Sequence, residues 1–134
     1  MRIDAIVFDC RDAAPLARFW GAALGWGVAP YDEAELDRLA RKGVYDPEED
    51  PSVMLEPPED SDLPVIFFTE VSEDRAGRNR VHLDLAADHD HEAEIERLEA
   101  LGARLRNWVE EDGQIWAVMH DPEGNEFCVM PPRG

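Results

Sequence analysis

The chain has 134 residues, a length that suits one globular domain with a proper core and is too short for two independent ones. Its formal net charge of −18 argues against nucleic acid as a partner, because the phosphate backbone would be repelled. The same charge argues against an anionic membrane surface, and no apolar run approaches the ~18 residues of a membrane-spanning helix.

Cysteine is used sparingly. Cys10 and Cys128 are the two cysteines, and neither belongs to a Cys-x-x-Cys pair. This usage is typical of reduced thiols, so we expect a cytoplasmic protein. A disulfide between them stays open at this point, because both residues lie on predicted strands.

The first half of the chain predicts a strand, a helix and three further strands. Residues 3–8 form a mostly apolar strand, which we expect to be buried on both faces or nearly so. Asp12 can cap the helix that follows, and Gly25 ends it. The remaining strands are expected at residues 27–29, 52–56 and 65–71.

An additional helix is expected at residues 31–42, between the second and third strands. Its pattern is amphipathic, with Leu36 and Leu39 inward and Gly43 as its end. The second half of the chain has no counterpart, so we interpret this segment as an insertion within the first repeat.

The second half predicts the same order of elements without the insertion. A polar connection at residues 72–78 leads to a strand at 80–86 and a helix at 91–101. Three strands follow at residues 104–109, 114–120 and 126–130. The last two are joined by the tight turn Asp121-Pro122-Glu123-Gly124-Asn125.

The two halves are therefore repeats. Leu24-Gly25 and Leu101-Gly102 align at an offset of 77 (101 − 24), which also superimposes the two first strands without a gap. A βαβββ unit this short cannot bury both of its faces alone, so it needs its twin. We predict an α+β fold in which module one (residues 1–72) and module two (79–132) form a single domain over residues 1–134. A cleft is expected where the modules meet.

Three motifs carry a resemblance to a known family. They are Phe19-Trp20 with Leu24-Gly25-Trp26, Val81-His82-Leu83-Asp84-Leu85, and Asp121-Pro122-Glu123-Gly124-Asn125-Glu126-Phe127. With the doubled element order, they resemble the vicinal oxygen chelate superfamily: glyoxalase I, extradiol dioxygenases, and the bleomycin and fosfomycin resistance proteins. A glyoxalase-like branch is the most similar. The resemblance implies two paired βαβββ modules in a curved mixed sheet that encloses a cleft. Activity does not follow from it, since this fold hosts many chemistries.

Metal-using members of the superfamily take one ligand from the first strand and one from the last strand of each module. His82 stands at the first-strand position of module two, but its counterpart in module one (82 − 77) is Ala5, which cannot bind a metal. Cys128 stands at the last-strand position, and its equivalent in module one falls near Phe68 or Thr69.

Two ligands fall short of the three that a protein zinc or iron site ordinarily supplies. We therefore expect no metal cofactor. The alternative is one divalent metal (Zn, Fe, Mn or Ni) on His82, Cys128 and Glu70, with Glu56 also able to complete the set. A His/Cys pair suits a soft metal such as zinc.

Aromatic side chains provide the candidates for binding an organic ligand. Trp108 and Trp116 lie on strands of module two that can line the cleft, where an indole stacks on a flat or cationic molecule. With Phe68, His82 and Glu70 they form the candidate ligand-binding set, although core packing accounts equally well for each tryptophan. We interpret Asp88-His89-Asp90-His91 as a helix cap and not as a metal cluster.

The primary functional expectation is a metal-free small-molecule-binding protein that sequesters, confers resistance to or senses its ligand. The alternative is a metal-dependent lyase or dioxygenase with His82 as a ligand; no catalytic residue is assigned. A third hypothesis is an interaction module with a vestigial cleft, docking a partner through residues 31–42. The resemblance also implies a homodimer.

Overall fold

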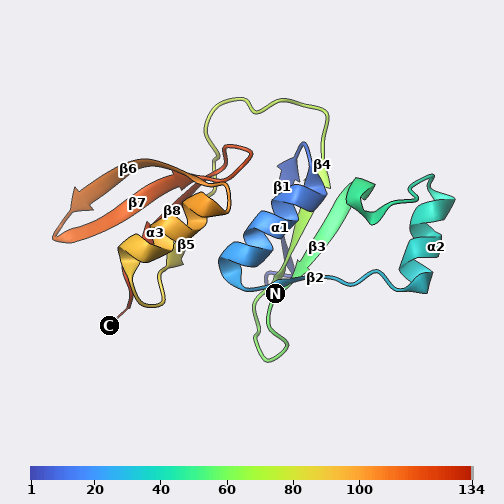
Figure 1. Cartoon of the computed structure of the whole chain (residues 1–134), viewed down its shortest axis with the longest axis horizontal. Helices are drawn as coiled ribbons and strands as arrows, with labels where there is room; N and C mark the ends of the chain where they lie inside the picture. The colour runs from blue at the N-terminus through green and yellow to red at the C-terminus, as the bar shows by residue number, and fades with distance from the viewer. Residues whose placement is uncertain (134) are drawn as a thin grey trace. The chain divides into compact units, whose positions relative to one another are not determined.

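The computed structural model describes residues 1–133 and divides the chain into two compact units (Figure 1). Unit 1 spans Met1–Glu73, and unit 2 begins at Asp74. Each unit contains one four-stranded mixed sheet. Within the described residues, no helix is long and apolar enough to cross a membrane.

Unit 1 contains four strands, two α-helices and one short 3-10 helix. In chain order they are β1 (Ala5–Cys10), α1 (Ala13–Leu24), β2 (Gly27–Val28), α2 (Glu33–Arg41), η1 (Pro47–Glu49), β3 (Ser52–Glu56) and β4 (Val65–Glu70). The strands are ordered β1-β4-β3-β2. β1 runs parallel to β4, and the other pairs are antiparallel.

The core of unit 1 lies between α1 and one face of this sheet. Leu16 and Trp20 of α1 are buried, as are alternate residues of β3 and β4, so one face of each strand meets the helix. Phe8 stacks on Phe68 at 5.4 Å between ring centroids and lies 5.6 Å from Trp20. The helix ends at Gly25, whose φ of 72° is favourable for glycine.

Unit 2 repeats this plan without the inserted helices. It comprises β5 (Leu83–Ala86), α3 (His91–Ala100), β6 (Arg104–Glu111), β7 (Gln114–His120) and β8 (Glu126–Met130). Its strand order β5-β8-β7-β6 corresponds to that of unit 1, again with the first and last strands parallel. The predicted α+β class and the two βαβββ modules are confirmed.

Burial in unit 2 separates the two faces of its sheet. Phe127 and Val129 of β8 are buried, as are Ala117 and Met119 of β7 and two residues of α3, Ile95 and Leu98. Because side chains alternate along a strand, these residues define the face that carries α3, and the residues between them belong to the opposite face.

The first strand differs from the prediction, because it is not buried on both faces. Val7 is 57% exposed and Ile3, before the strand, is 71% exposed. β1 lies at the edge of its sheet, and α1 covers only the face that carries Phe8. Apolar composition alone cannot distinguish an edge strand from a central one.

Smaller differences concern element ends and the inserted helix. Residues 80–82 precede β5 instead of opening it, and β6 continues to Glu111. In α2 Leu39 is buried, as predicted, but Leu36 is 40% exposed. The insertion is held to unit 1 by the Tyr31 hydroxyl, which donates to buried Asp50 at 2.7 Å.

Candidate functional site

A cavity of about 380 Å³ lies on the face of the unit 2 sheet opposite α3. Its volume falls in the range of small-molecule sites, roughly 300–1,000 Å³. The lining residues come from β5, β7, β8 and the segments that lead into them: Arg78, His82, Asp84, Gln114, Trp116, Val118, Glu126, Cys128 and Met130. The strand alternation explains this set, since the lining residues of β7 and β8 alternate with those that are buried on the α3 face.

Three side chains with metal-binding atoms meet in this cavity. The donor atoms of His82, Asp84 and Cys128 all lie within 4.8 Å of one another. Asp84 and Cys128 are paired across β5 and β8, and His82 lies two residues before Asp84, on the same face. His82 Nε2 approaches Asp84 Oδ1 at 3.1 Å.

Cys128 is held as a thiol in this arrangement. Burial raises the pKa of the Cys128 thiol, and the charge and hydrogen bond of Asp84 raise it further, against an opposing effect of Arg78. Because the thiolate is the nucleophilic form, this cysteine is a poor nucleophile as it stands.

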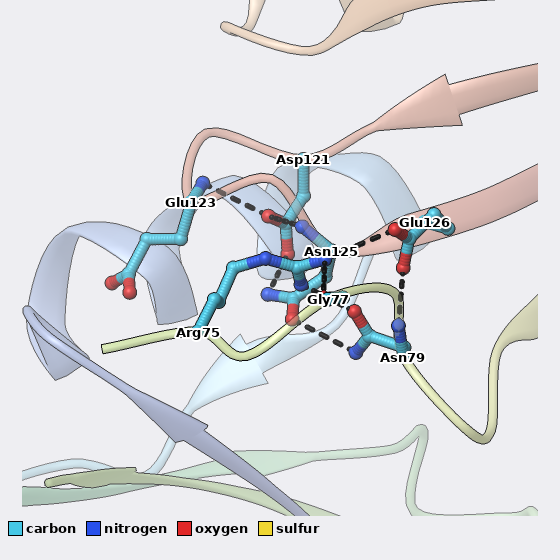
Figure 2. Close-up of polar contacts among 7 residues, drawn as sticks. All are labelled: Arg75, Gly77, Asn79, Asp121, Glu123, Asn125 and Glu126. Atoms are coloured by element: carbon cyan, nitrogen blue, oxygen red, sulfur yellow. Dashed lines mark hydrogen bonds and ion pairs between the residues drawn. The ribbon is translucent and has the colours of Figure 1, made fainter. Parts of the chain in front are cut away.

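The cavity wall at Glu126 is fixed by a network of polar contacts, which Figure 2 shows. Arg75 donates to one carboxylate oxygen of Glu126 at 3.0 Å, and the Asn79 amide donates to the other at 2.8 Å. The Asn79 side chain donates to Asn125, which in turn donates to buried Asp121. The segment that leads into β5 is thereby tied to the β7–β8 hairpin.

The same contacts keep Glu126 ionised. Burial raises the pKa of Glu126, but its backbone hydrogen bonds, led by the Asn79 amide, and the Arg75 guanidinium outweigh burial and hold it below the ordinary value. Glu126 is therefore a charged part of the wall, with both oxygens already engaged by the protein.

Of the five predicted ligand-binding residues, the structure brings two together. His82 and Trp116 both line the cavity. Trp108 lies elsewhere, because it pairs with Ala117 and therefore belongs to the α3 face. There its ring meets His91 edge-on at 5.2 Å.

Phe68 and Glu70, the other two, belong to unit 1. Phe68 is fully buried in the ring cluster beneath α1. Glu70 accepts a hydrogen bond from the Ala13 amide, the first residue of α1, at 3.1 Å. This carboxylate replaces the predicted cap by Asp12, whose side chain makes no capping hydrogen bond. Glu70 is thus a helix-capping residue of unit 1.

The pairing of strands also corrects the predicted counterpart of Cys128. Asp84 pairs with Cys128 in unit 2, and Val7 (84 − 77) pairs with Phe67 in unit 1. The position equivalent to Cys128 is therefore Phe67, not Phe68 or Thr69. Unit 1 has Ala5, Val7 and Phe67 where unit 2 has its three donors, and none of these three side chains can bind a metal.

Asp84 was not among the predicted site residues, although its spacing from His82 indicates that both face the same side. His82 and Asp84 are separated by one residue on a predicted strand, so alternation alone places them on one face. Arg78 was also missed, because nothing in a polar connecting segment indicates which side chain will turn toward a sheet.

The cysteines and the histidine-rich segment remain to be placed. Cys10 lies in unit 1 and Cys128 in unit 2, and no disulfide is recorded in the part of the chain that the structure describes. Asp90 caps α3 by accepting from the Ala93 amide, and His91 Nε2 contacts the Val129 carbonyl at 2.8 Å. This confirms the helix-cap interpretation.

A family model described as the glyoxalase-like domain matches residues 5–130, nearly the whole described chain. The chain belongs to the glyoxalase-like domain family. Among proteins with curated descriptions, none matches it.

Solved structures show how widely the glyoxalase-like fold is shared. A glyoxalase/bleomycin resistance protein/dioxygenase family enzyme from Burkholderia phytofirmans is 18% identical, with a TM-score of 0.68 over 98% of this chain and 100% of that one. The fosfomycin resistance protein FosX from Mesorhizobium loti is 13% identical, with a TM-score of 0.64 over 98% and 92%. FosX from Listeria monocytogenes is 10% identical, with a TM-score of 0.67 over 99% and 94%. At these identities the likeness concerns the fold.

Proposed function

We propose that this glyoxalase-like protein binds a small organic molecule in the unit 2 cavity and thereby sequesters it, confers resistance to it or senses it. The observation that supports the proposal is the cavity itself: about 380 Å³, lined by Trp116 and by five ionisable side chains. A mostly apolar hollow with a few convergent polar groups is the usual form of a ligand site.

The lining indicates the chemistry of the ligand. The Trp116 indole offers a flat surface for an aromatic or cationic group. Arg78 and Asp84 bring opposite charges to the same cavity, whereas both oxygens of Glu126 are taken by Arg75 and Asn79. We therefore expect a compact, partly flat molecule with polar groups at its edge.

A metal-dependent lyase or dioxygenase with His82 as a ligand is the second candidate function. It is favoured by Asp84, which adds a third donor to the pair that the sequence indicated. A divalent metal would supply Lewis-acid polarisation of substrate oxygens. In that case Arg78 and Trp116 would orient a substrate beside it.

The hypothesis of an interaction module receives less support. A vestigial site would require Trp116 to be packed into a core, but this side chain lines a cavity. The expected homodimer stays a prediction, which sedimentation equilibrium at several protein concentrations tests directly.

The proposed function is tested by a thermal-shift screen of small polar aromatic and amine compounds, followed by calorimetry. We expect a compound that stabilises the wild-type protein to lose at least tenfold in affinity in Trp116→Ala, about 1.4 kcal/mol. Trp108→Ala is the matched control, because it removes the same side chain from the opposite face of the same sheet. Equal loss in both variants would contradict the proposal, and so would a screen in which no organic compound stabilises the protein and only a divalent metal does.

A further inference from the structure

His82, Asp84 and Cys128 provide one nitrogen, one oxygen and one sulfur donor within a single unit. Asp84 contacts both of the others, through His82 Nε2 at 3.1 Å and a hydrogen bond with the Cys128 thiol. A set of mixed N, O and S donors is one that zinc accepts, since zinc is bound by histidine, carboxylate and thiolate alike.

The spacing of the donors agrees with a zinc ion. Around tetrahedral zinc, with bonds of about 2.0–2.3 Å, the ligand atoms lie about 3.3–3.6 Å from one another. The His82–Asp84 distance is already close to this, and the limit of 4.8 Å on the whole set leaves side-chain shifts of roughly 1 Å. Side chains of His82 and Asp84 are 41% and 57% exposed, so an ion has an entry path.

We propose that unit 2 alone binds one zinc ion between His82, Asp84 and Cys128, with the fourth coordination position open to the cavity. The equivalent positions of unit 1 are occupied by Ala5, Val7 and Phe67, which offer no metal-binding atom. On binding, the Cys128 thiol transfers its proton to buffer and binds as the thiolate. The charges of Asp84 and this thiolate then balance those of the ion.

The other histidine- and acid-rich segment of unit 2 does not provide such a set. Asp90 is used as the cap of α3, and His91 is held between the Val129 carbonyl and the Trp108 ring. Its neighbour His89 is exposed, so it serves as a control for weak surface binding of metal.

The experiment uses the full chain, freed of metal by a chelator, dialysed under a non-thiol reductant and titrated with Co²⁺. We expect one equivalent to produce a thiolate-to-cobalt charge-transfer band and the visible bands of tetrahedral cobalt, and Zn²⁺ to displace both. Cys128→Ser removes the charge-transfer band. His82→Gln and Asp84→Asn each weaken zinc binding by at least about tenfold. Loss of a residue that only supports a ligand already costs about this much, and His82 and Asp84 are ligands themselves.

Cys10→Ala and His89→Gln are the matched controls and keep the bands and the affinity. A second measurement needs no variant: bound zinc protects Cys128 of the wild type from alkylation, which peptide mass spectrometry detects. Absence of the charge-transfer band, its persistence in Cys128→Ser, or alkylation of Cys128 unchanged by zinc would overturn the proposal. Because the probe is the metal alone, these results do not depend on whether Trp116 binds an organic molecule.

Discussion

At the scale of single residues, the position of a side chain on its sheet face decides what it can do. Trp108 and Trp116 are both tryptophans on strands of unit 2, yet one meets His91 beneath the sheet and the other lines the cavity. The difference arises because Trp108 pairs with Ala117, so its side chain points to the face opposite to that of Trp116. A shift of one residue would exchange the two roles.

Glu70 shows how a plausible ligand is used for structure instead. Its carboxylate accepts from the first amide of α1, where a negative charge also favours the helix dipole. We predict that Glu70→Ala lowers the free energy of unfolding by about 0.5–2 kcal/mol, the range for losing a helix cap. Glu70→Gln, which keeps an acceptor oxygen, loses less.

Equilibrium urea denaturation measures both Glu70 variants. Zinc affinity, measured in parallel, should be the same in each variant as in the wild type, because the proposed ligands are His82, Asp84 and Cys128. A variant that keeps full stability and loses metal would contradict the capping role.

At the scale of elements, the approach to β5 is fixed by the β7–β8 hairpin. Arg75 and Asn79 both donate to Glu126, which is 8% exposed and also faces the cavity (Figure 2). This network positions Arg78, which directly precedes Asn79, and His82, which lies between Asn79 and the start of β5. Loss of Glu126 would therefore loosen the cavity wall as well as lower stability.

The Glu126 contacts predict a pH dependence with a definite sign. Because folding lowers the pKa of Glu126, its contribution is fully present above its unfolded value near 4.5 and is lost as the pH falls through the lower folded value. At pH 7 we expect Glu126→Gln to lower the free energy of unfolding by about 1–3 kcal/mol, as for hydrogen bonds to a charged group.

Chemical denaturation of wild type and Glu126→Gln between pH 7 and pH 3 tests this dependence. The difference between the two proteins should shrink as the pH falls. A difference that is constant over the range, or that grows in acid, would rule out ionised Glu126 as the source of the stability.

At the scale of the whole molecule, the net charge of −18 opposes the compact state through self-repulsion. Raising NaCl from about 0.01 M to about 1 M shortens the Debye length from roughly 30 Å to 3 Å. We predict that the melting temperature rises over this interval. Sucrose at matched osmolarity, followed in the same calorimeter, is the uncharged control. A melting temperature that falls with salt would contradict the dominance of repulsion.

Most of the architecture follows from the repeated pattern. The offset between the Leu-Gly pairs predicts two βαβββ modules, because a repeated sequence imposes a repeated topology. The exposure of Val7 and Leu36 could not be predicted, since it depends on which strand lies at an edge and what covers the inserted helix. Local composition contains neither fact.

The candidate site was predictable only in part. His82, Cys128 and Trp116 follow from the repeat and the resemblance, and Asp84 follows from alternation once His82 is chosen. The roles of Phe68, Glu70 and Trp108 depend on register, which sequence leaves uncertain by one residue. That uncertainty is enough to move a side chain from a pocket to a core.

Zinc binding by His82, Asp84 and Cys128 is the most specific chemistry that we propose for this chain. An anomalous difference map at the zinc absorption edge, from crystals grown with one equivalent of zinc, tests it most directly. We predict one peak within about 2.0–2.3 Å of His82 nitrogen, Asp84 oxygen and Cys128 sulfur. A peak at His89 and its acidic neighbours, with none beside Cys128, would contradict it.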